Sequence, residues 1–86
     1  MSIYFTRHSR QRLKLYRIDR EDVIALLTKR KADKETIGER KEFVADDFVV
    51  KYGFPLKIAF VNEATRVVLI TVFRFDRETK YEDIIR

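Results

Sequence analysis

The residues of this chain best suited to chemistry are His8, Arg12 and Tyr16, which stand four positions apart. On a helix this spacing places side chains on one stripe, one turn from each other. A neutral imidazole accepts a proton near neutral pH, a guanidinium grips a phosphate in two places, and a nearby hydroxyl orients water or a leaving oxygen. The set suits metal-free RNA cleavage, in which the 2′-hydroxyl attacks its neighbouring phosphate, His8 acts as general base or acid, and an arginine stabilises the added charge.

A structural interpretation of the same residues stays open. His8 is the only histidine, and it would then cap a helix or pack beside a sheet while Arg12 pairs with an acid. Titratable groups in such clusters are often structural. A single histidine does not separate the two interpretations.

Arg74 is a further candidate for the catalytic site, because it stands between Phe73 and Phe75 at the end of an apolar segment. A cation with aromatic neighbours stacks on a base or holds a phosphate. Strand alternation nevertheless places Arg74 on the opposite face from both phenylalanines.

A run of cations precedes Asp19, the first acid of the chain, and consists of Arg7, Arg10, Arg12, Lys14 and Arg17. Nucleic-acid binding usually begins with such a patch, for which the candidates are Arg7, Arg10, Lys14 and Arg17. A solvated helix face has a similar composition. The formal net charge of +5 favours polyanionic partners, so RNA, DNA and an acidic protein all remain open.

Other kinds of site find little support in the sequence. The absence of cysteine removes disulfides, thiolate metal sites and cysteine nucleophiles. The chain also lacks a phosphate-cradling glycine loop, a histidine pair for zinc and a calcium loop. The acid pairs at 46–47 and 82–83 are better explained by a turn and a charged tail. We expect no metal and no cofactor.

Two helices are predicted at the start of the chain. Thr6 is placed to cap the first, from Arg7 to about Tyr16, with a core stripe of Ser9, Leu13 and Tyr16. Asp19 is placed to cap the second, roughly 20–30, and Asp22 imitates the acid of a capping box. The second helix is expected to bury Val23, Ile24, Leu26 and Leu27.

The rest of the chain predicts four strands over 36–45, 48–52, 56–61 and 66–75, with 3–6 as a short strand or an extended lead-in. Three successive hairpins would make an antiparallel meander. The predicted class is α+β, with two N-terminal helices packed on a four-stranded antiparallel sheet. The last strand is apolar on both faces and should be central or covered on both sides. Since two helices cover one face, the other would be shielded by the tail, a second copy or a partner protein.

The length of 86 residues suits one hydrophobic core. We expect a single domain over 1–75 and a C-terminal tail over 76–86, whose Tyr81, Ile84 and Ile85 have helical spacing and would dock back. No stretch reaches the length of a membrane span, and the N-terminus lacks the order of a secretion signal. A cytoplasmic location is therefore expected.

Two segments carry a resemblance to a known family: His8-Ser9-Arg10-Gln11-Arg12-Leu13 and Ile18-Asp19-Arg20-Glu21-Asp22-Val23. They resemble a bacterial family of unknown function that opens with His-Ala-x-x-Arg-Met, continues with Arg-Gly-Ile-Ser and an acidic helix start, and ends in an apolar strand containing Thr. Residues 68–73 resemble that strand. This chain has Tyr16-Arg17 where the family usually has Arg-Gly.

The family looks related to the RelE/ParE-like toxins, which place two helices on an antiparallel sheet. The resemblance implies a RelE-like fold and a ribonuclease or other toxin of a toxin–antitoxin pair, and it carries over His8 and Arg12. The leading hypothesis is a toxin-like, metal-independent ribonuclease, inhibited by an antitoxin that covers the exposed sheet face. The alternative is a non-catalytic basic module that binds nucleic acid or an acidic protein. A homodimer formed through the apolar sheet face is a third possibility.

Overall fold

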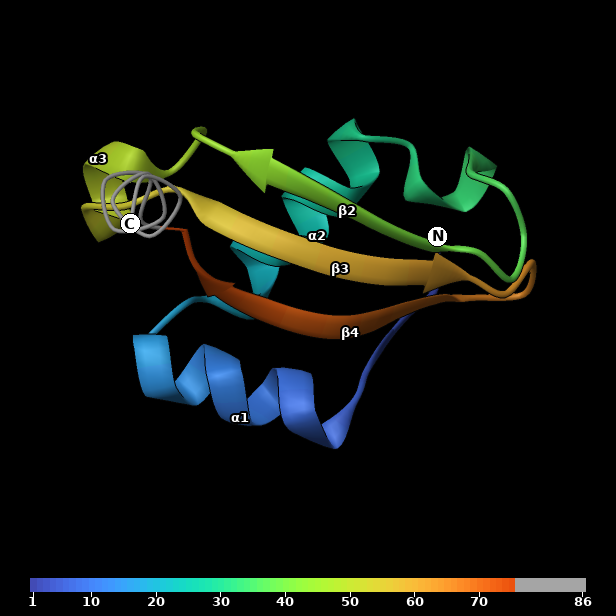
Figure 1. Ribbon diagram of the computed structural model, residues 1–86, viewed down its shortest axis with the longest axis horizontal. Coiled ribbons are helices and arrows are strands. Elements are labelled where there is room, and N and C mark those ends of the chain that lie inside the picture. The colour runs from blue at the N-terminus through green and yellow to red at the C-terminus, as the bar shows by residue number, and fades with distance from the viewer. Residues whose placement is uncertain (76–86) are drawn as a thin grey trace, which may run out of the picture.

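The chain forms a short strand, then two helices, then the remaining strands of the sheet (Figure 1). The computed structural model describes residues 1–75. The elements are β1 (Ile3–Phe5), α1 (Arg7–Tyr16), α2 (Arg20–Lys29), the 3-10 helix η1 (Ala32–Lys34), β2 (Arg40–Ala45), α3 (Val49–Tyr52), β3 (Leu56–Asn62) and β4 (Val67–Arg74). The α+β class is as expected. The predicted tail, 76–86, with its docking residues Tyr81, Ile84 and Ile85, lies outside the described residues.

The four strands form a mixed sheet in the order β1-β4-β3-β2, so the prediction of a purely antiparallel sheet was wrong. β2, β3 and β4 pair antiparallel, whereas β1 pairs parallel with β4. Parallel neighbours need a long crossover between them. Here that crossover contains both N-terminal helices, β2 and β3. Local patterning could not reveal that the short lead-in strand pairs with the last strand.

The predicted strand over 48–52 is instead the short helix α3. An apolar run of this kind is also typical of a strand. Here Phe48 and Tyr52 lie one helical turn apart, so the helical conformation lets both pack against the core. Val50, between them, is fully exposed, and Gly53 ends the helix in the left-handed conformation at φ 84°. β2 is also shorter than expected, because the strand begins at Arg40.

The core lies between the sheet and the helices, with α2 behind the sheet in the view of Figure 1. Of the four residues expected to be buried on α2, Val23, Leu26 and Leu27 are buried. Ile24 is 37% exposed, so that part of the prediction was wrong. Since Leu27 and Val23 stand one turn apart, they define the buried stripe and leave Ile24 on its margin.

β4 is central, between β1 and β3, as its apolar sequence predicted. Its pairing with β3 is irregular: Ala59 pairs with Thr71, while Phe60 pairs with Leu69. Ile70 is therefore an extra residue in β4, which makes a β-bulge. Bulges reset the alternation of side chains and are common beside functional sites.

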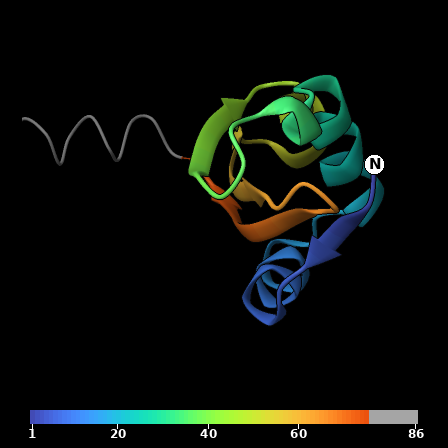
Figure 2. The same ribbon diagram turned by 90° about the vertical axis from the view of Figure 1, so that its right-hand side faces the viewer.

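The bulge decides which residues of β4 face the core. Val67, Leu69 and Val72 belong to the core cluster, although regular alternation would have turned Val72 away from it. Val68 and Thr71 take the opposite face. In Figure 2 the helix α2 lies on the core side of the sheet, and the opposite face, called the open face below, has no helix lying across its centre.

None of the helices within residues 1–75 has both the length and the apolar character that a membrane crossing requires.

Candidate functional site

Thr6 ties the start of α1 to the bulge in β4. Its side chain accepts from the Ser9 amide at 3.1 Å, so it caps the helix as predicted. The Thr6 hydroxyl also donates to the Ile70 carbonyl at 3.0 Å, and the Thr6 amide donates to the Leu69 carbonyl at 3.3 Å. These bonds place His8, two residues after the cap, beside Thr71, one residue after the bulge.

His8 and Arg12 lie next to each other on α1, as their spacing predicted. His8 Nε2 is 3.1 Å from the Thr71 hydroxyl and 3.5 Å from Arg12 Nε. When Arg12 donates, Nε2 accepts, as it does in the tautomer that carries its proton on Nδ1. Because a contact of 3.5 Å is a weak hydrogen bond, Arg12 keeps most of its donors for another acceptor.

An open pocket of about 360 Å³ lies between α1 and β4, lined by His8, Arg12, Tyr16, Thr71 and Phe73. The His8 ring is exposed and Arg12 is half-buried, so both are accessible. The Tyr16 ring packs edge-to-face against Phe54, with 6.4 Å between the ring centres. The three residues expected to act together therefore share one pocket.

Thr71 was not predicted as a site residue. A signal for it existed, since Thr71 is the only polar residue in the apolar run from Val67 to Phe73. Without the bulge, its position in the strand gave no reason to place it beside His8.

Arg74 does not line this pocket. Its guanidinium carbon lies 5.1 Å from the centre of the Phe54 ring, a cation–π contact. Phe54 in turn contacts Tyr16. Arg74 thus approaches the pocket only through two intervening rings, on the other side of the sheet from Phe73.

The basic residues of α1 lie on the other flank of the helix. Arg10, Lys14 and Arg17 follow His8 and Arg12 by roughly half a turn of rotation about the axis. They line a second open hollow, of about 420 Å³, with Leu13, Ile18, Asp19 and Arg20. Arg7 is exposed on the same helix. Within residues 1–75 these four predicted nucleic-acid contacts are brought near one another but not to the His8 pocket.

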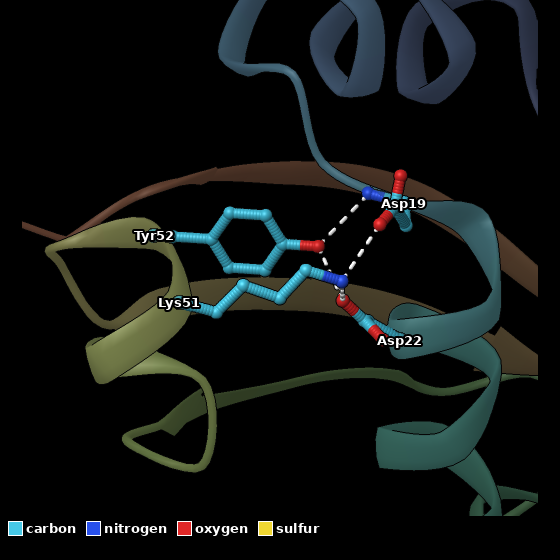
Figure 3. Close-up of polar contacts among 4 residues, drawn as sticks. All are labelled: Asp19, Asp22, Lys51 and Tyr52. Atoms are coloured by element: carbon cyan, nitrogen blue, oxygen red, sulfur yellow. Dashed lines mark hydrogen bonds and ion pairs between the residues drawn. The ribbon is translucent and has the colours of Figure 1, made fainter.

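A further polar cluster joins the start of α2 to α3 (Figure 3). Lys51 Nζ donates to Asp19 Oδ2 and Asp22 Oδ2, each at 2.7 Å. The Tyr52 hydroxyl donates to Asp22 and accepts from the Asp19 amide. The expected side-chain cap by Asp19 was wrong, since its carboxylate contacts Lys51 and makes no cap bond.

The charges of this cluster shift one another's pKa values. Lys51, and then the Tyr52 hydroxyl, lower the pKa of Asp22. The two carboxylates raise the pKa of Lys51. Burial, followed by the bond to Asp22, raises the pKa of Tyr52. All three shifts favour one arrangement: a carboxylate, an ammonium and a neutral phenol.

The sequence contained no spacing that would bring residues 19–22 and 51–52 together. The contact depends on α3 being a helix, because only then do Lys51 and Tyr52 both reach α2. The error in assigning 48–52 to a strand therefore concealed the cluster.

Among residues 1–75 no three His, Asp or Glu side chains are grouped so that they could hold a metal ion. Comparisons with protein-family models, with curated proteins and with solved structures find no match to this chain.

Proposed function

We propose that this protein is a metal-independent endoribonuclease of the toxin–antitoxin type. The observation that carries the proposal is the exposed His8 imidazole beside the Arg12 guanidinium, 3.5 Å apart at the pocket between α1 and β4. One group accepts a proton and the other binds a phosphate, and both are reachable by a polymer substrate.

The reaction uses the 2′-hydroxyl of RNA as its nucleophile. His8 Nε2 accepts the hydroxyl proton as the bond from O2′ to phosphorus forms. Arg12 donates two hydrogen bonds to the phosphate and stabilises its added charge. The bond from phosphorus to O5′ breaks, and the leaving oxygen takes the proton that His8 accepted from O2′, while Tyr16 hydrogen-bonds to that oxygen. The products are a 2′,3′-cyclic phosphate and a free 5′-hydroxyl.

Thr71 holds the ring for this step. A hydroxyl that donates to Nε2 fixes the orientation of the imidazole and gives way when substrate arrives. The bulge at Ile70 and the cap at Thr6 position the two partners from separate elements. A site built between a helix and a strand is more rigid than one on loops.

The resemblance of His8-x-x-x-Arg12 to the family related to RelE/ParE-like toxins supports this proposal. It suggests a RelE-like lineage, an antitoxin that covers the open face, and action in the cytoplasm. Lineage alone supports fold more than activity, so the chemistry of the site carries the argument.

The test is cleavage of labelled RNA by the purified protein, with and without ribosomes, in the presence of EDTA. Expected are products ending in 2′,3′-cyclic phosphate, and no cleavage at a position where a single 2′-deoxynucleotide replaces the ribonucleotide. Cleavage at that position would contradict the mechanism. Absence of cleavage under all conditions would contradict the function.

A non-catalytic binding module is the second candidate, favoured by the cations on the far flank of α1. Arg10, Lys14 and Arg17 line the 420 Å³ hollow, and no acid within residues 1–75 pairs with them. Polyanion binding without cleavage, lost on Arg10→Ala with Lys14→Ala and unaffected by His8→Ala, would support this candidate over the first.

A further inference from the structure

The open face of the sheet carries aromatic rings at both ends, each held by a cation. At one end the guanidinium carbon of Arg66 lies 4.5 Å from the centre of the Tyr4 ring, and Tyr4 is 45% exposed. At the other end Lys57 Nζ lies 5.7 Å from the Phe73 ring and 5.8 Å from the Phe75 ring. Each end of the face therefore carries an aromatic ring with a cation beside it.

Phe73 lines the His8 pocket, and strand pairing places Tyr4 farther along the same face. Tyr4 pairs with Val68, and Lys57 pairs with Phe73, so all four side chains take the open face. Thr71, which contacts His8, lies between them on β4. At about 3.3 Å per strand residue, Phe73 is roughly 7 Å from Thr71 along the strand. Neighbouring nucleotides of an extended strand span such a distance.

The middle of the face carries small side chains, and the acids beside it are paired with cations. Ala59 is fully buried and Val68 and Thr71 are nearly so, while Val44 and Val61 on the same face are half-buried. The acids nearby already have cations: Glu42 contacts Arg40 and Lys57, and Glu63 pairs with Arg66.

We infer that the open face is a platform for single-stranded RNA, on which a base beside the scissile phosphate stacks at Phe73 and a base farther along the strand stacks at the Arg66–Tyr4 pair. This inference rests on the proposed function and names its substrate class. Every base has a π-face, so stacking tolerates sequence. Duplex RNA buries those faces within its own stack and gains nothing from the aromatic residues. The enzyme therefore cuts unpaired RNA.

The experiment measures the affinity of the uncleaving His8→Ala protein for a fluorescein-labelled oligouridine, by anisotropy. Tyr4→Leu and Phe73→Leu, each added to that background, keep apolar volume but remove the π-face. Each is expected to weaken binding roughly 5- to 100-fold, from the stacking contribution of one base. Leu15→Ala removes an exposed apolar side chain from α1 and is the matched control, with unchanged affinity expected.

Tyr4 is exposed, so Tyr4→Leu folds even if Phe73→Leu does not, and melting curves of both accompany the assay. Unchanged affinity in the folded leucine variants, or equal affinity for the RNA annealed to its complement, would overturn the inference. Loss of self-association in Tyr4→Leu, measured by ultracentrifugation in a protein that binds no RNA, would also overturn it and assign the face to a second copy.

Failure of the two proposals is distinguishable, because cleavage by the protein with His8 intact is measured in parallel. If Tyr4→Leu and Phe73→Leu leave cleavage unchanged, the stacking platform is rejected and the ribonuclease function stands. If the protein binds single-stranded RNA through both residues but does not cleave it, the ribonuclease function is rejected and the stacking platform stands.

Discussion

Two polar clusters of this protein use similar side chains in opposite ways. In the first, Asp19, Asp22, Lys51 and Tyr52 satisfy one another through four hydrogen bonds between α2 and α3. In the second, His8 has one good contact, to Thr71, and one long contact, to Arg12. The polar groups of the first cluster hydrogen-bond to one another, whereas those of the second keep hydrogen-bonding capacity for a ligand.

The difference separates a structural cluster from a candidate site. Mutual pKa shifts mark the cluster of Asp22 and Lys51, although charge pairs that hold a fold shift pKa values just as catalytic groups do. The arrangement of unused hydrogen-bonding capacity at an open pocket is the better guide here. It points to His8 and Arg12.

Arg12→Ala is expected to have a large effect on cleavage and little effect on stability. Loss of the phosphate contact should lower kcat/KM for RNA cleavage about 100-fold, with the melting temperature unchanged, because Arg12 makes only a weak contact within the fold. Lys34→Ala, which removes an exposed cation from η1 outside the pocket, is the control and should retain near-normal cleavage. Equal losses in both variants would show that general charge, and not the site, is responsible.

Asp22→Asn should lower stability and leave cleavage unchanged. It weakens the bonds to Lys51 and Tyr52, so the free energy of unfolding should fall by about 1 kcal/mol and Tm by about 4–8 °C, while cleavage per folded molecule stays the same. Thermal denaturation followed by circular dichroism measures the change. Asp47→Asn, which breaks only the exposed pair with Lys29, is the control and should change Tm much less. A comparable fall of Tm in both variants would show that the cluster is no more stabilising than an exposed ion pair.

The acid limb of the stability curve tests the Asp22 contacts independently. The pKa of Asp22 is lowered in the folded state from its ordinary value of 3.8, so its contribution is present above that value and is lost as pH falls through the folded pKa. Below about pH 4 the wild-type Tm should therefore decline more steeply than that of Asp22→Asn. Parallel curves for the two proteins would contradict the assigned shift.

The smallest effect is expected on the far flank of α1. Arg10→Ala with Lys14→Ala removes two cations from the 420 Å³ hollow. If RNA phosphates reach it, the slope of log affinity against log salt should become shallower by about 1.4 for a single strand. Lys29→Ala on α2 is the control. An unchanged slope would restrict RNA to the open face.

The sequence predicted the elements of the first thirty residues well, because caps and periodicity act locally. Thr6 caps α1 as expected, and Val23, Leu26 and Leu27 form the buried stripe of α2. The juxtaposition of His8, Arg12 and Tyr16 followed from helical spacing alone and is confirmed by the pocket that they line.

Features that depend on distant contacts were not predictable in the same way. The parallel pairing of β1 with β4, and the bulge at Ile70 that turns Thr71 toward His8, arise from register between segments more than sixty residues apart or across a hairpin. The apolar run 48–52 suits a strand or a short helix equally, and tertiary packing of Phe48 and Tyr52 decides for the helix.

The role of His8 is tested most directly by the single-turnover rate of RNA cleavage by His8→Ala, compared with Asp22→Asn at equal concentrations of folded protein. A loss of 100-fold or more, on the order expected for removal of a general base, is expected in His8→Ala alone. Cleavage by His8→Ala at the rate of Asp22→Asn would contradict the proposed mechanism, because His8 would then take no part in the reaction.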